Sequence, residues 1–357
     1  MVFRFISLLS ASCLLIAACA SDSTADATTA PATAEAAIPG VASPADANEV
    51  FRPATAAESS KNKTAKSDRV TIEASVETLG NLVRAVGEQA GGNVVLMSGV
   101  ESRVLTGIDI KRRSVADSVA ILAAGGGLTV NENAEYFFLF PDGYEQLLSV
   151  SLAGRLDARY ANVTTDAAFG SGLPLFSVFM WMGYALDMTI IGDHSISDAH
   201  SGELALKQVS LETALEAVLK SARVVSLATD STPEFIFLAA PANKNPSSLL
   251  LEEASLTDAQ RDVLDKQVSL ALPRPLRTGQ RMEMSMQPSK LGDILPTLSE
   301  QLGITVVAEK GLLEFPVNPF YVHKARLGTA MDLLLRQWLE ANYGYQLVKD
   351  RIVIRRK

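Results

Sequence analysis

Histidines beside carboxylates are the residues of this chain whose types and spacing come closest to a chemical site. His194 and His200 lie in one short stretch with two aspartates, in the order Asp-His-x3-Asp-x-His. Imidazole and carboxylate groups are usual zinc ligands, so this stretch is a candidate metal site with His194 and His200 as ligands. The alternative is a polar, solvated loop between two strands, and we adopt this simpler interpretation.

Sequence motifs of known catalytic sites are missing. The chain has no Gly-x-Ser-x-Gly, no P-loop and no Rossmann fingerprint, and no serine has a partner histidine at a readable spacing. Gly125-Gly126-Gly127 follows an expected helix, whereas a phosphate loop would precede one. Glu73, Glu77 and Glu88 are scattered over polar helix positions and do not resemble the carboxylate pair of a glycosidase. We therefore expect no enzymatic activity and no cofactor.

A helical pattern that recurs three times would position these residues. Its first copy has apolar residues at offsets 0, 3, 4, 7 and 11, which form one face of an α-helix. Moving forward by 96 residues, and then by a further 116, gives the same pattern twice more. The three sets are Leu79, Leu82, Val83, Val86 and Ala90; Leu175, Val178, Phe179, Met182 and Leu186; and Leu291, Ile294, Leu295, Leu298 and Leu302.

A second helical face follows 36 residues later in every copy, beginning at Val115, Leu211 and Leu327. Strand-like segments lie between the two helices of each copy. Such a periodic recurrence is the signature of an internal repeat. We predict an α+β fold made of three tandem βαββαββ modules, each a small mixed sheet packed on two helices, at residues 69–140, 150–240 and 281–357.

The second module departs from the common pattern. Its first strand is expected near Leu156–Tyr160, and an inserted loop at Thr164–Gly172 separates that strand from the helix. The helix Leu175–Leu186 is apolar almost all round, so we expect it to be covered on more than one side. Its residues Phe176 and Trp181 are a candidate contact with a neighbouring protein. The alternative, which we favour, is that they pack against the inserted loop.

The third module begins after a connecting segment. Residues 241–280 are expected to form a linker with one short helix, Asp258–Lys266. The alternation of Met282, Met284 and Met286 then predicts the first strand of the module. A proline inside its first helix, at position 296, is expected to kink that helix or to mark a shifted start.

The N-terminal sequence is typical of a targeting segment. Arg4 precedes an apolar run that ends in Leu-Ile-Ala-Ala-Cys at Cys19, and this run is too short to span a bilayer comfortably. The segment resembles the lipobox of bacterial lipoproteins, in which cleavage before the cysteine leaves it carrying the lipid. Residues 1–19 are therefore expected to be a lipoprotein signal peptide, with Cys19 retained and lipidated. The alternative is an ordinary secretory signal with Cys19 incidental.

The segment after the cysteine is expected to be a tether. Residues 20–67 are rich in Ala, Thr, Ser, Pro and Asp and have few large apolar groups, so they cannot bury enough surface to offset their ordering entropy. Ala20 follows the cysteine, which resembles the pattern that sorts lipoproteins to the outer membrane. We expect a periplasmic protein, lipid-anchored to the outer membrane through a disordered linker.

The charge of the chain argues against nucleic acid as a partner. Its formal net charge is −8, and it has no basic block except at the last few residues. Nucleic-acid binding requires clustered lysine and arginine to displace counterions from the phosphates.

The repeated pattern resembles a known domain family. The strand–helix pair at 70–91 and the run Gly-Glu-Leu-Ala-Leu-Lys-Gln-Val-Ser-Leu-Glu-Thr-Ala-Leu at 202–215 are similar to the short N-terminal domain shared by secretins and TonB-dependent receptors, the STN or secretin N0 domain. The resemblance implies a periplasmic protein–protein interaction module. It implies as partners a secretin or an inner-membrane component of a secretion or pilus system, and it leaves oligomer formation open.

We therefore expect a non-enzymatic assembly protein of an envelope secretion or pilus system. Two alternatives stay open: a signalling or scaffolding lipoprotein, and a cell-wall-binding protein or enzyme. The unpaired backbone groups of a strand edge can accept a partner strand. The last strand is the candidate edge, with the residues Arg351, Ile352, Val353, Ile354 and Arg355. Equally, this strand could lie inside its sheet.

Overall fold

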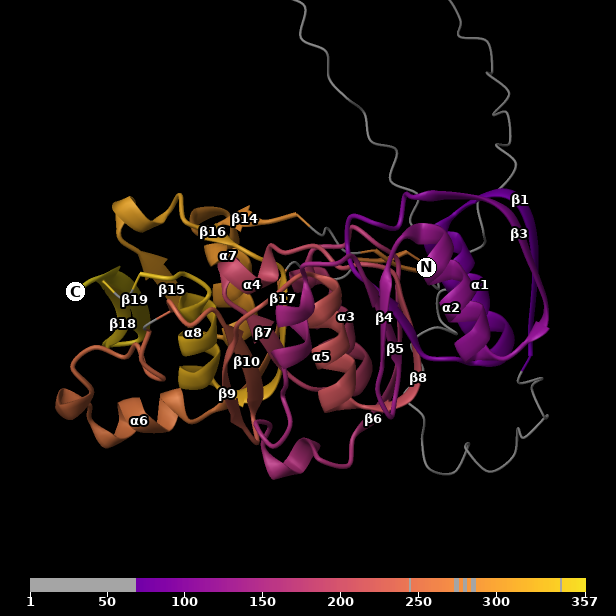
Figure 1. The fold of residues 1–357 in the computed structure, drawn as a ribbon. Helices are drawn as coiled ribbons and strands as arrows, with labels where there is room; N and C mark the ends of the chain where they lie inside the picture. The colour runs from indigo at the N-terminus through magenta and orange to yellow at the C-terminus, as the bar shows by residue number, and fades with distance from the viewer. Residues whose placement is uncertain (1–68, 244, 273–275, 279–280, 284–286, 341) are drawn as a thin grey trace, which may run out of the picture.

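The computed structural model describes residues 69–243, 245–272, 276–278, 281–283, 287–340 and 342–357 (Figure 1). The fold is mixed α+β with several small sheets, which confirms the predicted fold class. The expected signal peptide, Cys19 and the tether at 20–67 lie outside the described residues. Among the described helices, not one is long and apolar enough to cross a membrane.

The first part of the chain has the predicted order of elements. We call residues 70–140 the first unit. In this unit β1 pairs antiparallel with β3, while β5 pairs parallel with β2 and antiparallel with β4. The side chains of Thr78 and Ser114 cap the two helices by accepting backbone N–H groups of the first turn. The elements are β1 (Val70–Thr78), α1 (Leu79–Ala90), β2 (Val94–Leu96), β3 (Val104–Arg113), α2 (Val115–Gly126), β4 (Thr129–Glu132) and β5 (Phe137–Phe140).

The second unit, residues 164–239, has a different first strand from the one predicted. The expected inserted loop is itself strand β6, and residues 158–160 of the predicted strand form a 3-10 helix instead. In β6, Thr165, Ala167 and Phe169 alternate as its buried positions. The elements are β6 (Thr164–Phe169), α3 (Leu175–Leu186), β7 (Ile190–Gly192), α4 (His194–Ser197), β8 (Leu204–Ser210), α5 (Leu211–Ser221), β9 (Ala228–Thr232) and β10 (Phe235–Ala239).

The third unit, residues 267–356, begins earlier than predicted. Its first strand is β11, which lies in the expected linker, whereas Met282 belongs to the short hairpin β12–β13. Met284 and Met286 lie outside the described residues. The elements are β11 (Gln267–Leu272), β12 (Leu276–Thr278), β13 (Arg281–Glu283), β14 (Ser289–Lys290), α7 (Leu291–Leu302), β15 (Thr305–Ala308), β16 (Pro316–Val317), β17 (Phe320–Arg326), α8 (Leu327–Arg336), β18 (Tyr343–Val348) and β19 (Arg351–Arg356).

Two sequence-based expectations for this region had different outcomes. The predicted short helix of the linker is present as α6 (Asp258–Leu264), with Thr257 as its cap. The other expectation, that Pro296 could mark a shifted helix start, is wrong, because α7 begins at Leu291 and is one helix of 12 residues that includes Pro296.

The same strand pairing recurs in the three units. In the second unit β6 pairs with β8, and β10 pairs with β7 and β9; in the third, β11 pairs with β17, and β19 pairs with β15 and β18. Each first pair contains a register shift beside a residue with positive φ, and these residues are Arg112, Gln208 and Lys324. The first helices end in left-handed residues at Gly91, Asp187 and Gly303. All these positions keep the spacing of the predicted repeat.

The elements stack as alternating layers from one end of the molecule to the other (Figure 1). The β1–β3 ribbon covers α1 and α2 at one end. Next follow the sheet that contains β4, β5 and β8, then α3 and α5, and then the strands β7, β10 and β17. The helices α7 and α8 and the final sheet of β15, β18 and β19 close the other end, where the C-terminus lies.

Two hydrophobic cores meet at the β7–β10 sheet. Ile190 and Ile236 belong to the core shared by the first two units, whereas Ile191 and Phe237 belong to the core of the third. Successive residues of a strand point to opposite faces of the sheet, so one sheet supplies both cores. The second and third units are therefore joined by apolar burial on a common sheet.

Candidate protein-binding edges

The stretch with the two candidate metal ligands is not the solvated loop that was expected: it forms the short helix α4, with Asp193 buried at its start and the His200 side chain exposed. The ring of His194 contacts the carbonyl oxygen of Pro316 through Nε2 at 3.1 Å and the amide of Asn318 through Nδ1 at 3.1 Å. The backbone of His200 forms an isolated β-bridge with the backbone of Pro174. Asp193 is buried and accepts from the backbone of Ile196 and Ala240. Within the described ranges, no group of three or more His, Cys, Asp or Glu side chains is placed to hold a metal ion.

The predicted docking edge at the last strand is wrong. Strand β19, which contains Arg351–Arg355, lies between β15 and β18 and pairs with both. Ile352 and Ile354 are fully buried. Because both sides of β19 already carry hydrogen bonds, this strand has no edge to offer a partner. The edge strands of this sheet are β15 and β18.

The aromatic helix α3 is covered from within the chain. Phe176 is buried and Trp181 packs partly buried against the core of the first two units. The ring of Tyr184 lies 5.2 Å from that of Tyr321 on β17, so the third unit packs against this helix. The preferred alternative, packing on an inserted loop, does not hold as stated because that segment is strand β6.

The first two units join edge to edge. Strand β2 pairs antiparallel with β8, and this produces one five-stranded sheet in the order β4-β5-β2-β8-β6. The guanidinium of Arg84 on α1 forms two hydrogen bonds of 2.7 Å with the carboxylate of Glu203, whose side chain is only 5% exposed. Hydrogen bonding to this buried carboxylate raises the pKa of Arg84. A bidentate pair fixes orientation as well as distance.

Close backbone approach makes this junction possible. A Cβ at Gly87 would lie 2.7 Å from the Cβ of Ala205 on the incoming strand, and a Cβ at Gly202 would lie 1.8 Å from the carbonyl oxygen of Leu96. Beside them, the backbone N–H of Lys207 donates to Asn93 Oδ1 at 2.7 Å. Glycine at these two positions lets the helix and the two strands touch.

A similar junction joins the third unit to the second. The backbone N–H of His323 on β17 donates to Thr189 Oγ1 at 2.9 Å. Thr189 and His323 stand at the repeat positions of Asn93 and Lys207. A Cβ at Gly183, the repeat position of Gly87, would lie 2.7 Å from Met188 O of its own unit and 3.6 Å from the ring of Tyr321, which is an ordinary contact. Unlike the first junction, this one has no β-sheet pairing between its two strands, since β7 and β17 belong to different sheets.

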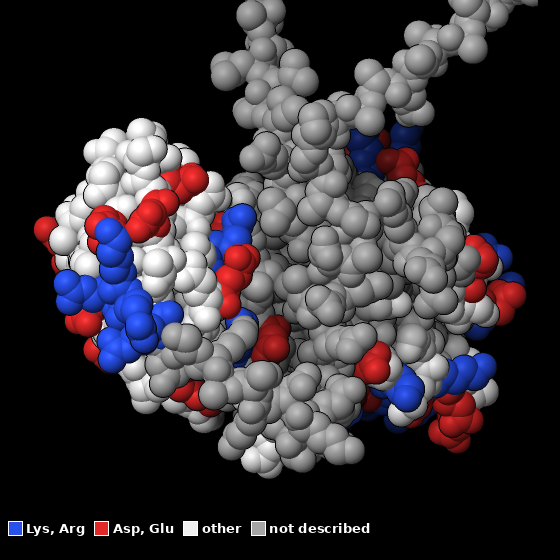
Figure 2. All heavy atoms as spheres, turned by 90° about the vertical axis from the view of Figure 1, so that its right-hand side faces the viewer, with Lys and Arg blue, Asp and Glu red and all other residues white. Residues whose placement is uncertain are grey.

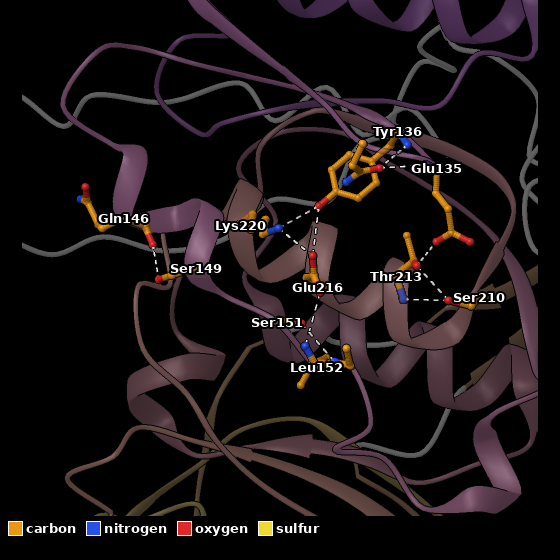
Figure 3. A network of polar contacts seen from close by, with 12 residues as sticks. Glu135, Tyr136, Gln146, Ser149, Ser151, Leu152, Ser210, Thr213, Glu216 and Lys220 are labelled. Atoms are coloured by element: carbon orange, nitrogen blue, oxygen red, sulfur yellow. Dashed lines mark hydrogen bonds and ion pairs between the residues drawn. The ribbon is translucent and has the colours of Figure 1, made fainter.

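A buried polar network strengthens the first junction (Figure 3). The ammonium of Lys220 on α5 lies 2.6 Å from Glu216 Oε1 and 3.2 Å from the hydroxyl of Tyr136. The second carboxylate oxygen of Glu216 accepts the backbone N–H of Leu152. Burial raises the pKa of Tyr136, so this phenol stays protonated. The network ties the first unit and the connecting segment to one helix of the second unit.

The same figure shows a second polar contact between these units. The hydroxyl of Thr213 on α5 contacts Ser210 Oγ at 2.8 Å and the carboxylate of Glu135 (Figure 3). Glu135 belongs to the turn between β4 and β5. These contacts connect that turn to the start of α5.

A cavity of about 440 Å³ lies where the second and third units meet. Two of the three arginines that line it are paired with carboxylates: Arg336 Nη1 lies 2.8 Å from Asp230 Oδ2, and Arg326 contacts Glu234 at 3.1 Å. The guanidinium of Arg336 also lies 4.1 Å from the centre of the Phe237 ring. These two paired arginines contribute to the contact between the units and are not free to bind an anionic ligand.

Asp332 in this cavity is expected to make stability depend on pH. Its Oδ1 accepts from the backbone N–H of Leu249 at 2.7 Å, and burial raises its pKa to about 7. The folded chain therefore keeps a proton that the unfolded chain releases, and the stability gained at low pH is lost as pH rises towards 7. Relative to Asp332→Asn, unfolding of the wild type should become easier by roughly 3 kcal/mol between about pH 4 and 7. Urea denaturation at several pH values, with Asp332→Asn as the pH-insensitive control, measures this slope; equal slopes would contradict it.

In the third unit, the strand that corresponds to β2 has no docked strand within the described chain. Strand β15 holds the repeat position of β2 and β7 and pairs with β19 on one side only. On the other edge of the same sheet, the segment around Leu250 bridges to β18, because the backbone N–H of Leu251 donates to Tyr345 O. The residues that make these junctions were not predicted from the sequence; glycine inside the first helix, at position 87, was the available signal for the first of them.

Comparison with known proteins gives no relative. A scan of protein-family models, a search of curated proteins and a search of solved structures found no match to this chain.

Proposed function

We propose that the chain consists of three tandem copies of one small α+β module and acts as a non-enzymatic protein-interaction component. The observation that carries this proposal is the pairing of β2 with β8, in which one unit binds the next through a strand edge. The contact of His323 with Thr189 repeats part of this arrangement. Modules that bind one another by strand edges have the chemistry to bind a partner protein in the same way, through edges that the internal junctions do not use, such as the outer strands β4 and β6 of the five-stranded sheet.

The place of action follows from the N-terminal sequence. Its lipobox-like run supports an anchor on Cys19, and the residue after it supports the outer membrane as the site of attachment. Multiple acyl chains on one residue give stable anchoring, which a single chain does not. Together with the resemblance to STN domains, this points to a periplasmic lipoprotein that contacts a secretin or an inner-membrane component of a secretion or pilus system.

The direct test is affinity purification of the full chain from its own envelope, crosslinked before solubilisation. We expect a secretin or another component of a secretion or pilus machine to be recovered with the wild type. A Cys19→Ser variant is the matched control and should leave the membrane fraction. Recovery of no envelope machine, with the protein monomeric and bound to peptidoglycan, would contradict the proposal.

A further inference from the structure

One position of the first helix is occupied by different residues in the three units, at the place where a strand of the following unit can dock. At the two filled junctions these residues are Gly87 and Gly183, and in the third unit the residue is Ser299. At Gly87 an added Cβ would lie 2.7 Å from the Cβ of Ala205, so any side chain there would collide with the docked strand. At Gly183 the atom nearest to an added Cβ is Met188 O of the same unit, so only the first junction shows this collision with the docked strand. A serine on α7 therefore occupies space that an incoming strand needs.

The hydroxyl of Ser299 also engages the strand edge itself. Ser299 Oγ accepts the backbone N–H of Val306 at 2.9 Å and donates to Leu295 O at 2.7 Å. Val306 holds the repeat position of Val94, the residue of β2 that pairs with Ala205 of the docked strand. The serine hydroxyl thus forms a hydrogen bond, within its own unit, with the backbone N–H of a residue whose equivalent in β2 pairs with β8.

The first unit carries charged residues on the strand that corresponds to β8. Strand β3 holds the repeat position of β8, and where β8 has Ala205, β3 has Asp109. Lys111 lies 2.9 Å from Asp109 and 3.6 Å from Glu73, and all three side chains are more than half exposed. Figure 2 looks onto this end and shows acidic and basic side chains interspersed on the described surface. Charges on an edge strand disfavour pairing with another chain.

We propose that Ser299 closes the third acceptor edge, so that the chain ends its own series of docked units and does not add a second copy head to tail. A second copy is the relevant occupant, because the described chain has one acceptor edge, β15, and one donor strand, β3, left over from the junctions that it makes internally. A contact between these two surfaces would be heterologous and would continue from copy to copy into a filament or ring. This inference rests on the proposed equivalence of the three units.

The test restores the residues of the first junction at both ends. In the full chain in detergent, Ser299→Gly combined with Asp109→Ala should self-associate at least about tenfold more tightly than the wild type, as measured by light scattering across a concentration series. Ser299→Ala combined with Asp109→Ala is the matched control, because it keeps the Cβ, and it should associate like the wild type. If the glycine variant associates no more tightly than this control, the proposal is overturned.

A second measurement does not depend on how well the glycine variant folds. In Ser299→Ala the amide of Val306 loses its acceptor, so its hydrogen exchange should accelerate by at least about tenfold while the amide of Val94 stays unchanged. An unchanged rate at Val306 would overturn the proposal. Either failure would leave the partners recovered from the envelope unaffected, so it would be distinguishable from failure of the proposed function.

Discussion

Replacing Gly202 by alanine is expected to break the junction between the first two units. The added Cβ would lie 1.8 Å from Leu96 O and 2.8 Å from Ser98 N, and neither backbone atom can move without displacing β2. Leu96 donates to Glu203 O at 2.7 Å in the same place, so separating the strands also removes hydrogen bonds. We expect the free energy of unfolding to fall by about 3 kcal/mol or more, measured by chemical denaturation.

The control for this variant is Gly125→Ala. Gly125 lies within α2, and a Cβ there would meet only the side chain of Leu105 at 3.5 Å, an ordinary contact. Alanine is favoured over glycine in a helix by up to about 1 kcal/mol, so this variant should be as stable as the wild type or slightly more so. Equal stability of the two variants would show that Gly202 does not lie against β2.

Removing the guanidinium of Arg84 is expected to have an effect of similar size. Arg84→Ala would leave the carboxylate of Glu203 buried without its cation. Breaking one side of a buried ion pair costs about 3–5 kcal/mol, because the remaining charge stays desolvated. Denaturant titration measures the loss. The combined variant Arg84→Met with Glu203→Gln should lose less than the sum of the single changes, since it removes both charges together.

Lys290→Ala is the matched control for Arg84→Ala. Lys290 forms an ion pair of 2.6 Å with Glu314, but both side chains are well exposed. Exposed pairs contribute less than about 1 kcal/mol. If Arg84→Ala costs no more than Lys290→Ala, the Arg84–Glu203 pair does not hold the junction.

The helices could be predicted from the sequence because their signal is local. The helices α1, α3 and α7 begin at Leu79, Leu175 and Leu291, where the first apolar residue of each repeated face stands. One buried face per helix repeats every three or four residues, and that pattern survives changes of side chain.

First strands were harder to predict, since their patterns are short. Strand β6 alternates Thr165, Ala167 and Phe169 on its buried side, and two of these residues are too small or too polar to be recognised as core. Conversely, the alternation around Met282 was regular, yet that residue lies in a two-stranded hairpin outside the repeated pairing. A period of two identifies an extended segment but not its partner strand.

The junctions depend on contacts between distant residues, which a single sequence does not reveal. Arg84 and Glu203 are 119 residues apart, and neither stands in a recognisable motif. The expected edge at Arg351–Arg355 failed for a related reason: the final hairpin suggested an outer strand, whereas the parallel pairing of β19 with β15 places that strand inside its sheet.

Each later unit docks on the unit before it, and three equivalent backbone amides test this docking most directly. The amides of Lys207 and His323 donate across the two junctions, while that of Lys111 faces no preceding unit in the described chain. Hydrogen exchange at single-residue resolution on the full chain should therefore find the amides of Lys207 and His323 at least about tenfold slower than that of Lys111. A His323 amide that exchanges as fast as that of Lys111 would contradict docking of the third unit on the second.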